Sequence, residues 1–356
     1  MKSYKKDFDA IIIGSGIGGL VTASQLASKG ARVLVLEKYI IPGGSGGSFR
    51  RKNYTFDVGA SMIFGFGKKG YTNLLTRALK DVNESCETIP DPVQLEYHLP
   101  NNFNISVDKN YENFISELSQ LFPKERYGIE RFYRACKKVF DCLDSMPLLS
   151  IEDPDYLLKV FFKAPLSCLG LARWLPVNAG DVAKKYIKDP ELLKFIDIEC
   201  FCWSVMPAMK TPMINAGMVF TDRHVGGINY PKGGVGKIAE KLVKGLEKLG
   251  SRIRYKANVT EILIENNKAI GVKLLNGEKL YSNIVVSNAT RWDTFGLSNQ
   301  KGSLVKKEFV PRDEYKWSKT YKPSPSFVSL HLGTKKNLIN DNFNCHHILL
   351  EDWQEL

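Results

Sequence analysis

The chain has 356 residues, 44% of them hydrophobic, and a formal net charge of +12. This length can bury one large core or two smaller ones, and the charge would suit nucleic acid, an anionic membrane or a basic soluble surface. The lysines are dispersed and form no basic–aromatic cluster or zinc-finger spacing, which argues against nucleic acid as a partner. Seven cysteines form no ligand pattern, and an odd number without a signal peptide indicates a reducing compartment.

The first sixty residues carry the strongest pattern in the chain. Asp7–Ile13 (DFDAIII) predicts a buried strand that leads into residues 14–19 (GSGIGG), which fit G-x-G-x-x-G. A helical run to Lys29 follows, and a second strand over Arg32–Leu36 ends at Glu37. A strand before the glycines, a helix after them and an acid about twenty residues on are the context of a dinucleotide-binding fold. The alternative is a glycine-rich turn without a ligand.

Each part of this pattern has a physical reason. Gly14 makes the tight turn, Gly16 lets the backbone approach a pyrophosphate, and Gly19 lets the helix pack on the strand. The helix N-terminus offers free N–H groups and a partial positive charge to phosphates. Glu37 is placed to accept hydrogen bonds from ribose hydroxyls. The pattern therefore predicts an adenine dinucleotide as ligand.

Two more glycine-rich loops decide which dinucleotide is expected. They are residues 41–48 (IPGGSGGS) and 56–61 (FDVGAS). A nicotinamide enzyme has no evident use for them, whereas FAD extends further and brings its second phosphate and ribityl chain past more backbone. Taken alone, the loops could be mobile surface turns. Together with the first glycine pattern, they resemble the flavoprotein family that includes amine oxidases and carotenoid desaturases.

The region from residue 69 to 221 is mixed and more helical. No run in the sequence reaches transmembrane length without a charge or a proline, and Tyr156–Leu175 comes nearest. It is interrupted by Lys159, Lys163, Pro165 and Arg173. Two structures fit this segment. It could lie on a bilayer surface with its basic groups among the lipid phosphates, or it could form an ordinary helix pair.

After residue 226 the pattern returns to that of a cofactor domain. Residues 235–249 keep a helical apolar stripe, and Asn276-Gly277 predicts a tight hairpin turn. Residues 301–325 read as a polar, poorly patterned connection, and the adjacent His346 and His347 as surface residues, so no metal site is expected. The strands are expected at Arg252–Tyr255, Thr260–Ile264, Ala269–Leu274 and, buried, at Ile284–Ser287.

Three later blocks sharpen the resemblance. They are residues 222–234 (DRHVGGINYPKGG), 256–262 (KANVTEI) and 284–295 (IVVSNATRWDTF). With the early loops they closely resemble the carotenoid isomerases, a branch of the carotenoid desaturase-type FAD flavoproteins, over nearly the whole chain. The resemblance implies an α/β fold, namely a Rossmann-like FAD-binding fold of the glutathione-reductase type with an interleaved α+β substrate domain. It also implies that 222–234 is the turn before a second helix that contacts the cofactor.

The resemblance implies cis–trans isomerisation of poly-cis-lycopene (prolycopene) to all-trans-lycopene, with reduced FAD and no net redox. A flavin oxidoreductase that acts on a polyene, of the carotene desaturase or retinol saturase type, is the first alternative. A truncated remnant without turnover is the second. The oligomeric state is left open.

The resemblance also implies a set of site residues. Glu199 and Arg223, the latter with His224, are candidates for a charged side chain near the flavin that stabilises the intermediate. The alternatives are that Glu199 is a paired core carboxylate and that Arg223 only fixes the turn. Val259 is expected to bring its backbone to the adenine. Candidates for a polyene tunnel, or for ordinary core packing, are Phe201, Trp203, Met206, Met209 and Met213. The residues expected to contact FAD are Gly14, Gly16, Gly18, Gly19, Glu37, Lys38, Gly43, Gly44, Ser45, Gly59, Ala60, Ser61, Gly234, Val259, Ser287 and Ala289.

The domain organisation implied by the resemblance is discontinuous. The FAD-binding domain is expected at 1–68 and 222–297, and the substrate and membrane-facing domain at 69–221 and, incomplete, at 298–356. The family's C-terminal Gly-Asp segment is missing, so we expect a C-terminally truncated chain. No signal or transit peptide fits before the first strand, which favours a bacterial, photosynthetic cell with the protein peripheral on the cytoplasmic face of the membrane.

Overall fold

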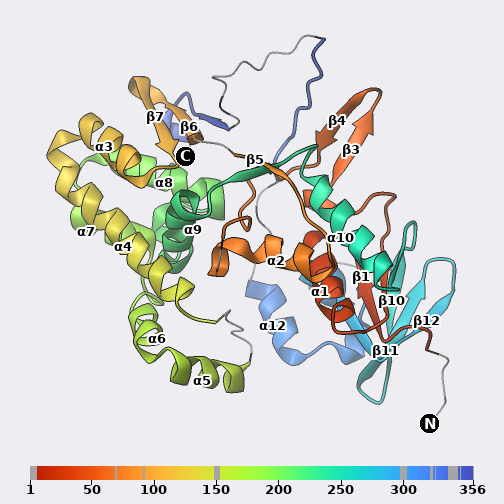
Figure 1. Ribbon diagram of the computed structural model, residues 1–356. Helices are drawn as coiled ribbons and strands as arrows, with labels where there is room; N and C mark the ends of the chain where they lie inside the picture. The colour runs from red at the N-terminus through yellow and green to blue at the C-terminus, as the bar shows by residue number, and fades with distance from the viewer. Residues whose placement is uncertain are drawn as a thin grey trace. The chain divides into compact units, whose positions relative to one another are not determined.

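The chain passes back and forth between two structural units in the computed structural model (Figure 1). Unit 1 comprises Met1–Ser61, Thr76–Ile89 and Tyr230–Gly333, and unit 2 comprises the remaining three segments, Met62–Leu75, Pro90–Asn229 and Thr334–Leu356. The structure describes residues 6–68, 70–90, 93–147, 153–296, 303–320, 324, 326–335, 344 and 346–355. The two domains predicted from the sequence also alternate along the chain. Residues 76–89 and 303–333, which were expected in the substrate domain, group with unit 1 instead. Their functional assignment stays a prediction.

A four-stranded parallel sheet organises unit 1, in the order β13-β1-β2-β9. The strands are β1 (Ala10–Ile13), β2 (Val33–Leu36), β9 (Arg252–Arg254) and β13 (Ile284–Ser287). Ile13 pairs with both Leu36 and Ser287, and Leu36 pairs with Arg254, so all four carboxyl ends share one edge. β1 and β2 are completely buried, as central parallel strands usually are. The predicted α/β, Rossmann-like fold is confirmed.

Two helices of unit 1 lie side by side (Figure 1): α1 (Ile17–Ala27) and α10 (Gly236–Lys248). Each begins directly after a glycine-containing loop. The predicted stripe on α10 is buried, including Ile238, Leu242 and Leu246. The remaining elements of unit 1 or its borders are α2 (Leu74–Asp81), β3 (Ser48–Arg51), β4 (Tyr54–Asp57), β5 (Thr88–Pro90), β8 (Asn229–Pro231), β10 (Val259–Glu265), β11 (Lys268–Leu274), β12 (Lys279–Tyr281), α11 (Arg291–Phe295) and α12 (Arg312–Thr320).

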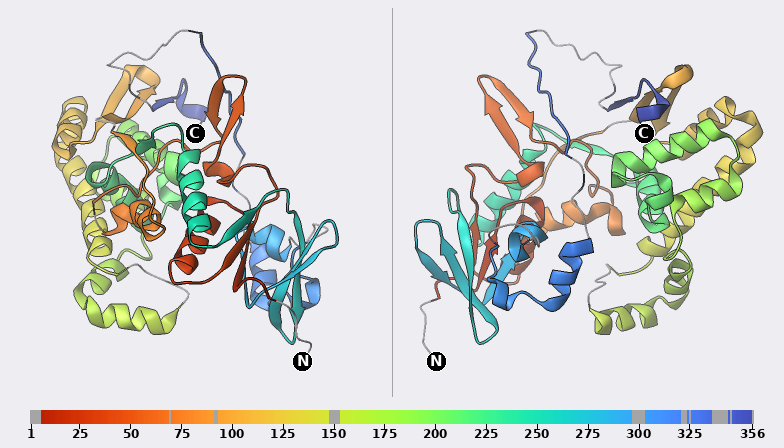
Figure 2. Two further views of the ribbon diagram at one scale, coloured as in Figure 1. Left: turned by 45° about the vertical axis from the view of Figure 1, so that its right-hand side comes forward. Right: turned by 180° about the vertical axis from the view of Figure 1, so that it is seen from behind.

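The antiparallel strands β10, β11 and β12 form a meander beside the parallel sheet, drawn in cyan in Figure 2. The predicted turn at Asn276-Gly277 joins β11 to β12, with the Gly277 N–H donating to the Leu274 carbonyl at 2.9 Å. The turn before it, at Asn266 and Asn267, has φ of 50° and 58°, which asparagine tolerates better than most residues. Sequence reasoning did not identify that turn.

Two sequence expectations in unit 1 are wrong. β13 is not buried, since Ile284 is 48% exposed, because β13 lies at the edge of the parallel sheet rather than inside it. Part of the expected 301–325 connection is the helix α12. Its Glu314 accepts two hydrogen bonds from Arg291 of α11, at 2.7 and 2.5 Å. The periodicity of residues 301–325 does not indicate this ion pair, because Arg291 lies 23 residues before Glu314.

Unit 2 is mostly helical, and Figure 1 shows α4 and α9 packed against each other. One continuous core joins its helices to the strands β6 and β7 and contains the buried rings of Tyr97, Phe114, Phe132, Tyr133 and Phe195. A third strand, β14, pairs with β6 in parallel. The elements are β6 (Val93–Leu99), β7 (Phe103–Asp108), α3 (Tyr111–Leu121), α4 (Arg126–Asp144), α5 (Pro154–Lys163), α6 (Pro165–Ala172), α7 (Ala179–Tyr186), α8 (Pro190–Ser204), α9 (Met213–Val225) and β14 (His347–Leu349).

The segment Tyr156–Leu175 forms the helix pair α5 and α6. Asp153 caps α5 by accepting from the Tyr156 N–H, and Pro165 starts α6 at a position that tolerates a missing N–H. Across the described part of the chain, none of the helices combines the length and the apolar character that crossing a membrane would require.

Candidate functional site

The first glycine loop (residues 14–19) lies at the carboxyl edge of the parallel sheet. The Gly14 N–H donates to the Leu36 carbonyl at 2.8 Å, which carries the strand pairing into the loop. Gly14 has φ +91°, a conformation that disfavours any residue with a side chain. A Cβ at Gly19 would overlap the Gly14 carbonyl oxygen, so this glycine lets α1 start close to the strand. Both glycine roles predicted at these positions thus have a geometric basis.

Glu37 lies at the end of β2 and is only 6% exposed. Its Oε2 accepts from the Ser15 backbone N–H at 2.8 Å and from the Ser15 hydroxyl at 2.6 Å. Its Oε1 accepts from the Tyr39 N–H at 2.8 Å. An ionised carboxylate offers about four acceptor positions, so Oε1 retains room for a ligand hydroxyl.

The second glycine loop (residues 43–47) lies against the first. The Gly43 N–H donates to the Ser15 carbonyl at 2.8 Å, and Gly43 has φ +107°. A Cβ on Gly44 would lie 3.4 Å from the Gly16 Cα, and one on Gly46 would lie 3.0 Å from Ile17 Cγ1. The second loop therefore reaches the first turn of α1.

The third loop (residues 57–61) is joined to the second by backbone hydrogen bonds. The Val58 N–H donates to the Gly47 carbonyl at 2.9 Å, and the Ala60 N–H to the Ser45 carbonyl at 3.2 Å. Gly59 and Ser45 are exposed, whereas Ala60 and Ser61 are half-buried. All three loops thus belong to one continuous backbone surface in unit 1.

Asp57 fixes the start of α10 to this surface. Its Oδ1 accepts from the Val235 N–H at 2.8 Å and from the Ser48 hydroxyl at 2.6 Å, while the same hydroxyl accepts from the Gly236 N–H at 2.8 Å. Its Oδ2 accepts from the Tyr230 hydroxyl at 2.5 Å. Sequence reasoning read Asp57 only as part of a glycine block, because its partners on α10 and Tyr230 lie more than 170 residues away.

Asn288 is a second residue that sequence reasoning missed. Its N–H donates to the Ile13 carbonyl at 2.8 Å, and its side chain faces the first loop. Cβ atoms built on Gly16 and Gly18 would lie 2.8 and 2.9 Å from its amide group. Asn288 therefore restricts the size of the side chains that the first loop can carry. In the sequence, Asn288 could have been found from its position between Ser287 and Ala289, which were both expected to contact FAD.

The other predicted contacts have less distinctive surroundings. Lys38 is exposed, and its ammonium lies 5.1 Å from the Tyr39 ring centre. Val259 pairs with Leu274 and its side chain belongs to the core of unit 1. Gly234 is buried with φ +99° beside Asp57, and the Ser287 hydroxyl lies 2.7 Å from that of Thr294. Cofactor contact by these residues stays a prediction.

The residues of unit 1 fit an adenine dinucleotide. Among the described residues no side chain caps α1, and no acid lies in its first turn, so its N–H groups and positive end suit a phosphate. Glu37 keeps an acceptor for a ribose hydroxyl. Three glycines at positive φ, Gly14, Gly43 and Gly234, leave backbone where a side chain would intrude.

The predicted catalytic residues Glu199 and Arg223 lie in the interior of unit 2, and both side chains are fully buried. Arg223 Nη1 donates to Glu199 Oε1 at 2.5 Å, and the Tyr133 hydroxyl donates to Oε2 at 2.6 Å. Burial raises the pKa of Tyr97 and Tyr133, so both hydroxyls stay protonated beside the carboxylate. The guanidinium also lies 4.8 Å from the Phe114 ring centre. These contacts match the alternative of a paired core carboxylate, and a catalytic role stays a prediction.

Residues 222–225 complete α9, so only the later part of the block 222–234 is the expected turn before α10. Burial raises the pKa of Asp222 to about 6, although its carboxylate accepts from the Gly226 N–H at 3.2 Å. Burial and the neighbouring Arg223 lower the pKa of His224 to about 3. Near neutral pH, His224 is therefore an uncharged ring.

The tunnel candidates divide into two groups. Met213 is fully buried in the core of unit 2. Phe201, Met206 and Met209 are 46%, 47% and 40% exposed. The indole ring of Trp203 packs on Phe64, with ring centres 5.2 Å apart. A tunnel formed by these residues stays a prediction.

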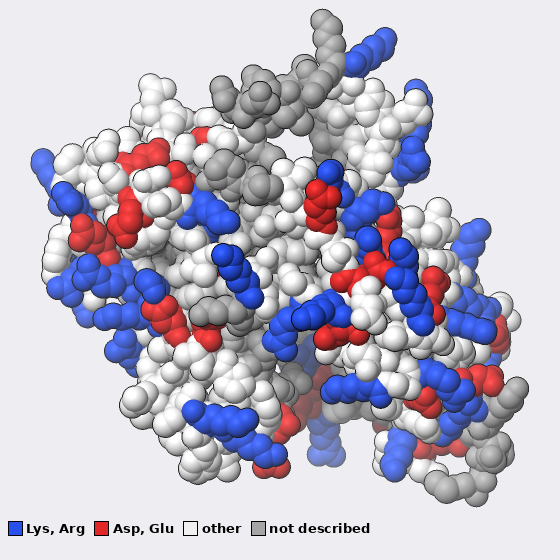
Figure 3. All heavy atoms as spheres, in the orientation of Figure 1, with Lys and Arg blue, Asp and Glu red and all other residues white. Residues whose placement is uncertain are grey.

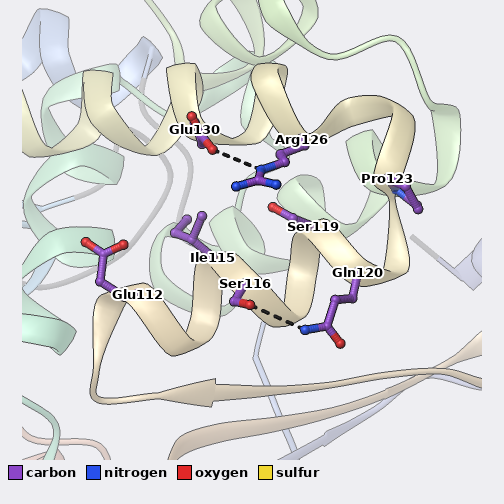
Figure 4. A pocket seen from close by; sticks show the side chains of 8 residues that line it. All are labelled: Glu112, Ile115, Ser116, Ser119, Gln120, Pro123, Arg126 and Glu130. Carbon is purple, nitrogen blue, oxygen red and sulfur yellow. Dashed lines mark hydrogen bonds and ion pairs between the residues drawn. The ribbon is translucent and has the colours of Figure 1, made fainter.

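A separate cavity of about 640 Å³ lies between α3 and the start of α4 (Figure 4). Its lining is mixed, with Ile115 and Pro123 beside polar side chains that include the ion pair of Arg126 with Glu130, at 3.3 Å. None of the predicted site residues lines it. It therefore carries no part of the cofactor site.

Comparisons with known proteins agree with this geometry. The family model described as flavin containing amine oxidoreductase matches residues 17–349, and the chain belongs to this family. A prolycopene isomerase, named as chloroplastic, from an Oncidium hybrid cultivar is 55% identical over 99% of this chain and 59% of its own length. A phytoene desaturase (neurosporene-forming) from Cereibacter sphaeroides is 29% identical over 80% of this chain and 54% of its own.

An oxidoreductase structure from Methanosarcina mazei matches with a TM-score of 0.62 and 21% identity, over 88% of this chain and 66% of that one. This likeness supports the fold. The chain spans less than two thirds of the length of these relatives. Membership of the family identifies the cofactor as FAD.

Glu37→Ala and Gly16→Val should each weaken FAD binding. The first change removes the ribose acceptor and releases Ser15, and the second places a valine side chain where it would collide with Asn288. A charged hydrogen bond of this kind contributes about 1.5–3 kcal/mol, so we expect roughly tenfold weaker binding for Glu37→Ala or more. Flavin fluorescence titration measures it. Lys29→Ala, at an exposed position just after α1, is the control, and affinities equal to wild type in both test variants would contradict the assignment.

Asp222→Asn should become more stable relative to wild type as the pH rises from 4 to 7. The folded pKa of Asp222 lies above its unfolded value of 3.8, so ionisation through about 6 destabilises the folded state. A shift of about two units corresponds to roughly 2–3 kcal/mol. Urea unfolding at several pH values measures the difference in free energy of unfolding between the variant and wild type. His224, whose lowered pKa has the opposite effect on stability, is present in both proteins, so its contribution cancels in this difference. A difference independent of pH would contradict the burial of this carboxyl.

Proposed function

We propose that this chain holds the FAD-binding part of an enzyme that isomerises poly-cis-lycopene to all-trans-lycopene without net redox. The observation that carries the proposal is the 55% identity with the Oncidium prolycopene isomerase over 99% of this chain. The three glycine loops in unit 1, with Glu37 and the uncapped start of α1, support the flavin requirement. The mainly apolar interior of unit 2 is compatible with a hydrocarbon substrate.

The residues of the chain have defined tasks in this proposal. The first loop and the N-terminus of α1 bind the pyrophosphate, Glu37 orients the ribose, and the second and third loops accommodate the rest of the cofactor by leaving backbone exposed. Bound in its reduced form, FAD would supply the electron density that lowers the bond order of the polyene. An ordinary double bond has a rotation barrier that strain alone does not overcome.

A flavin oxidoreductase on a polyene is the second candidate. The 29% identity with the phytoene desaturase favours it over other flavoprotein activities. The two candidates differ in the mass of the product, since a desaturase or a saturase changes the hydrogen count and an isomerase does not. A remnant that binds flavin without turnover is the third candidate.

We also propose that the helix pair α5–α6 contacts a lipid surface, where a carotene substrate would be found. Phe162 is 74% exposed, Leu166 83% and Leu169 60%, and these side chains lie near the exposed bases Lys159 and Lys163. Exposed apolar side chains flanked by bases suit an interfacial position on an anionic membrane. Elsewhere, on the face shown in Figure 3, basic and acidic side chains are intermixed.

A bacterial host and a position on the cytoplasmic face belong to the same proposal. The name of the Oncidium relative places that protein in the chloroplast. Peripheral attachment through α5–α6 would be compatible with either setting, because it depends only on an anionic surface.

The chain reconstituted with FAD should convert poly-cis-lycopene to the all-trans form only when the flavin is reduced. The assay uses anaerobic liposomes with dithionite-reduced or oxidised enzyme, and it resolves products by chromatography and mass. Unchanged mass and no stoichiometric use of reductant are expected. A product that differs by two hydrogens would contradict the isomerase and favour the oxidoreductase, and flavin binding without turnover would favour the remnant.

The double variant Phe162→Ser with Leu166→Ser should float less with anionic liposomes. Each apolar side chain contributes about 1.5–3 kcal/mol when it is buried, so partitioning should fall roughly tenfold or more. Leu275→Ser is the matched control, because Leu275 is 72% exposed on a hairpin of unit 1. Wild-type binding should also weaken at high salt. Flotation of the double variant equal to that of wild type would contradict this docking surface.

A further inference from the structure

Residues 326–333 (SFVSLHLG) run as an extended segment beside the hairpin of β3 and β4, within unit 1 (Figures 1 and 2). One side of this segment contacts the hairpin. The His331 ring packs on Phe49 of β3 and on Phe56 of β4, with ring centres 5.2 and 5.4 Å away. Two residues further on, a Cβ built on Gly333 would lie 3.1 Å from a tyrosine ring of the same hairpin. The odd-numbered residues therefore face unit 1.

The even-numbered residues form an apolar stripe on the other side, made of Val328, Leu330 and Leu332. Because side chains alternate along an extended strand, these three residues share one face. Val328 is 96% exposed, Leu330 81% and Leu332 74%. The whole run 326–333 contains no charged residue, although the chain carries a net charge of +12.

The backbone of this segment is unpaired as well. Within the part of the chain that the structure describes, none of residues 326–333 makes a hydrogen bond, and the segment belongs to none of the sheets. Native proteins protect exposed strands with charged side chains or prolines, and this run has neither. A hydrocarbon lying on the segment would leave its N–H and C=O groups without partners, whereas a second strand would satisfy them.

We propose that residues 326–333 pair in antiparallel fashion with the same segment of a second copy of this chain, about a two-fold axis at Leu330. Two-fold symmetry is the commonest arrangement of homo-oligomers, and an antiparallel pair of identical strands has it by construction. This register places Val328 opposite Leu332 of the partner subunit and Leu330 opposite its own copy, so the two apolar stripes join on one face. A shift by one residue would put the stripes on opposite faces.

The charge of the chain favours a second copy at this segment over other surfaces. Two molecules with a net charge of +12 repel each other wherever basic groups meet. The run 326–333 brings no like charges together, and Lys335 lies two residues beyond it. Standard interfaces involve about 20–30 residues a side, so a contact of eight residues gives a weak dimer, with a dissociation constant in the micromolar range.

Sedimentation velocity of the whole chain over a concentration series tests the pairing. Wild type should change from monomer to dimer as its concentration rises. Leu330→Lys and Leu330→Glu should each weaken dimerisation more than tenfold, because the two-fold axis places each new charge opposite its own copy. An equimolar mixture of the two variants should recover dimers that contain one of each, since opposite charges then face each other.

Leu275→Lys is the matched control, because Leu275 is 72% exposed on a hairpin of unit 1 and the change in charge is the same. This variant should dimerise as wild type does. Leu330 is itself exposed, so its variants should unfold at the wild-type temperature at low concentration. Wild type that stays monomeric at every concentration, or dimerisation unaffected by Leu330→Lys, would overturn the proposal. A mixture of the two Leu330 variants that stays monomeric would overturn the two-fold register.

Hydrogen–deuterium exchange distinguishes strand pairing from other occupants of the stripe. Amide exchange in the peptide covering residues 326–333 should slow as the wild-type concentration rises and should stay fast in Leu330→Lys. Dimers without slower exchange would overturn the strand pairing. A chain that is monomeric throughout, and whose binding of lycopene is lost in Leu330→Lys, would overturn the proposal and assign the stripe to the polyene.

Discussion

The hydrogen bonds between Glu37 and Ser15 hold the cofactor site of unit 1 together. The carboxylate at the end of β2 accepts from both the N–H and the hydroxyl of Ser15, and the Ser15 carbonyl accepts from the Gly43 N–H. One residue of the first loop thus links the second strand to the second loop. The third loop joins the second through the Ala60 N–H and the Ser45 carbonyl, so Glu37 connects to all three loops through one chain of hydrogen bonds.

The buried polar groups of unit 2 are organised differently. Arg223 and Glu199 pair away from solvent, and Tyr133 supplies a further hydrogen bond. Removing one partner of such a pair leaves an uncompensated charge, which typically costs about 3–5 kcal/mol, whereas the intact pair adds little net stability. This cost gives the pair a structural role that does not require catalysis. A loss of activity in a Glu199 variant would therefore indicate catalysis only if the free energy of unfolding of that variant were unchanged.

Local patterns predicted the parts of the fold that are built locally. The strand, glycine loop and helix around Gly14, the stripe of α10 and the hairpin at Asn276 follow from periodicity and turn chemistry over short stretches of sequence. The cap that Asp57 provides for α10, the helix α12 held by Arg291 and Glu314, and the pairing of Asn288 with the first loop join residues far apart in sequence. A single sequence does not show which distant side chains meet, so these features required the structure.

Hydrogen–deuterium exchange of the chain with and without FAD tests the central claim, that the three loops form one flavin site. FAD should slow amide exchange in peptides covering residues 14–20, 37–47 and 57–61 together, while α3 in unit 2 exchanges at an unchanged rate. The joint response is expected because hydrogen bonds through Ser15 and Ser45 connect the loops. Protection confined to unit 2, or an unchanged first loop with FAD bound, would contradict the account.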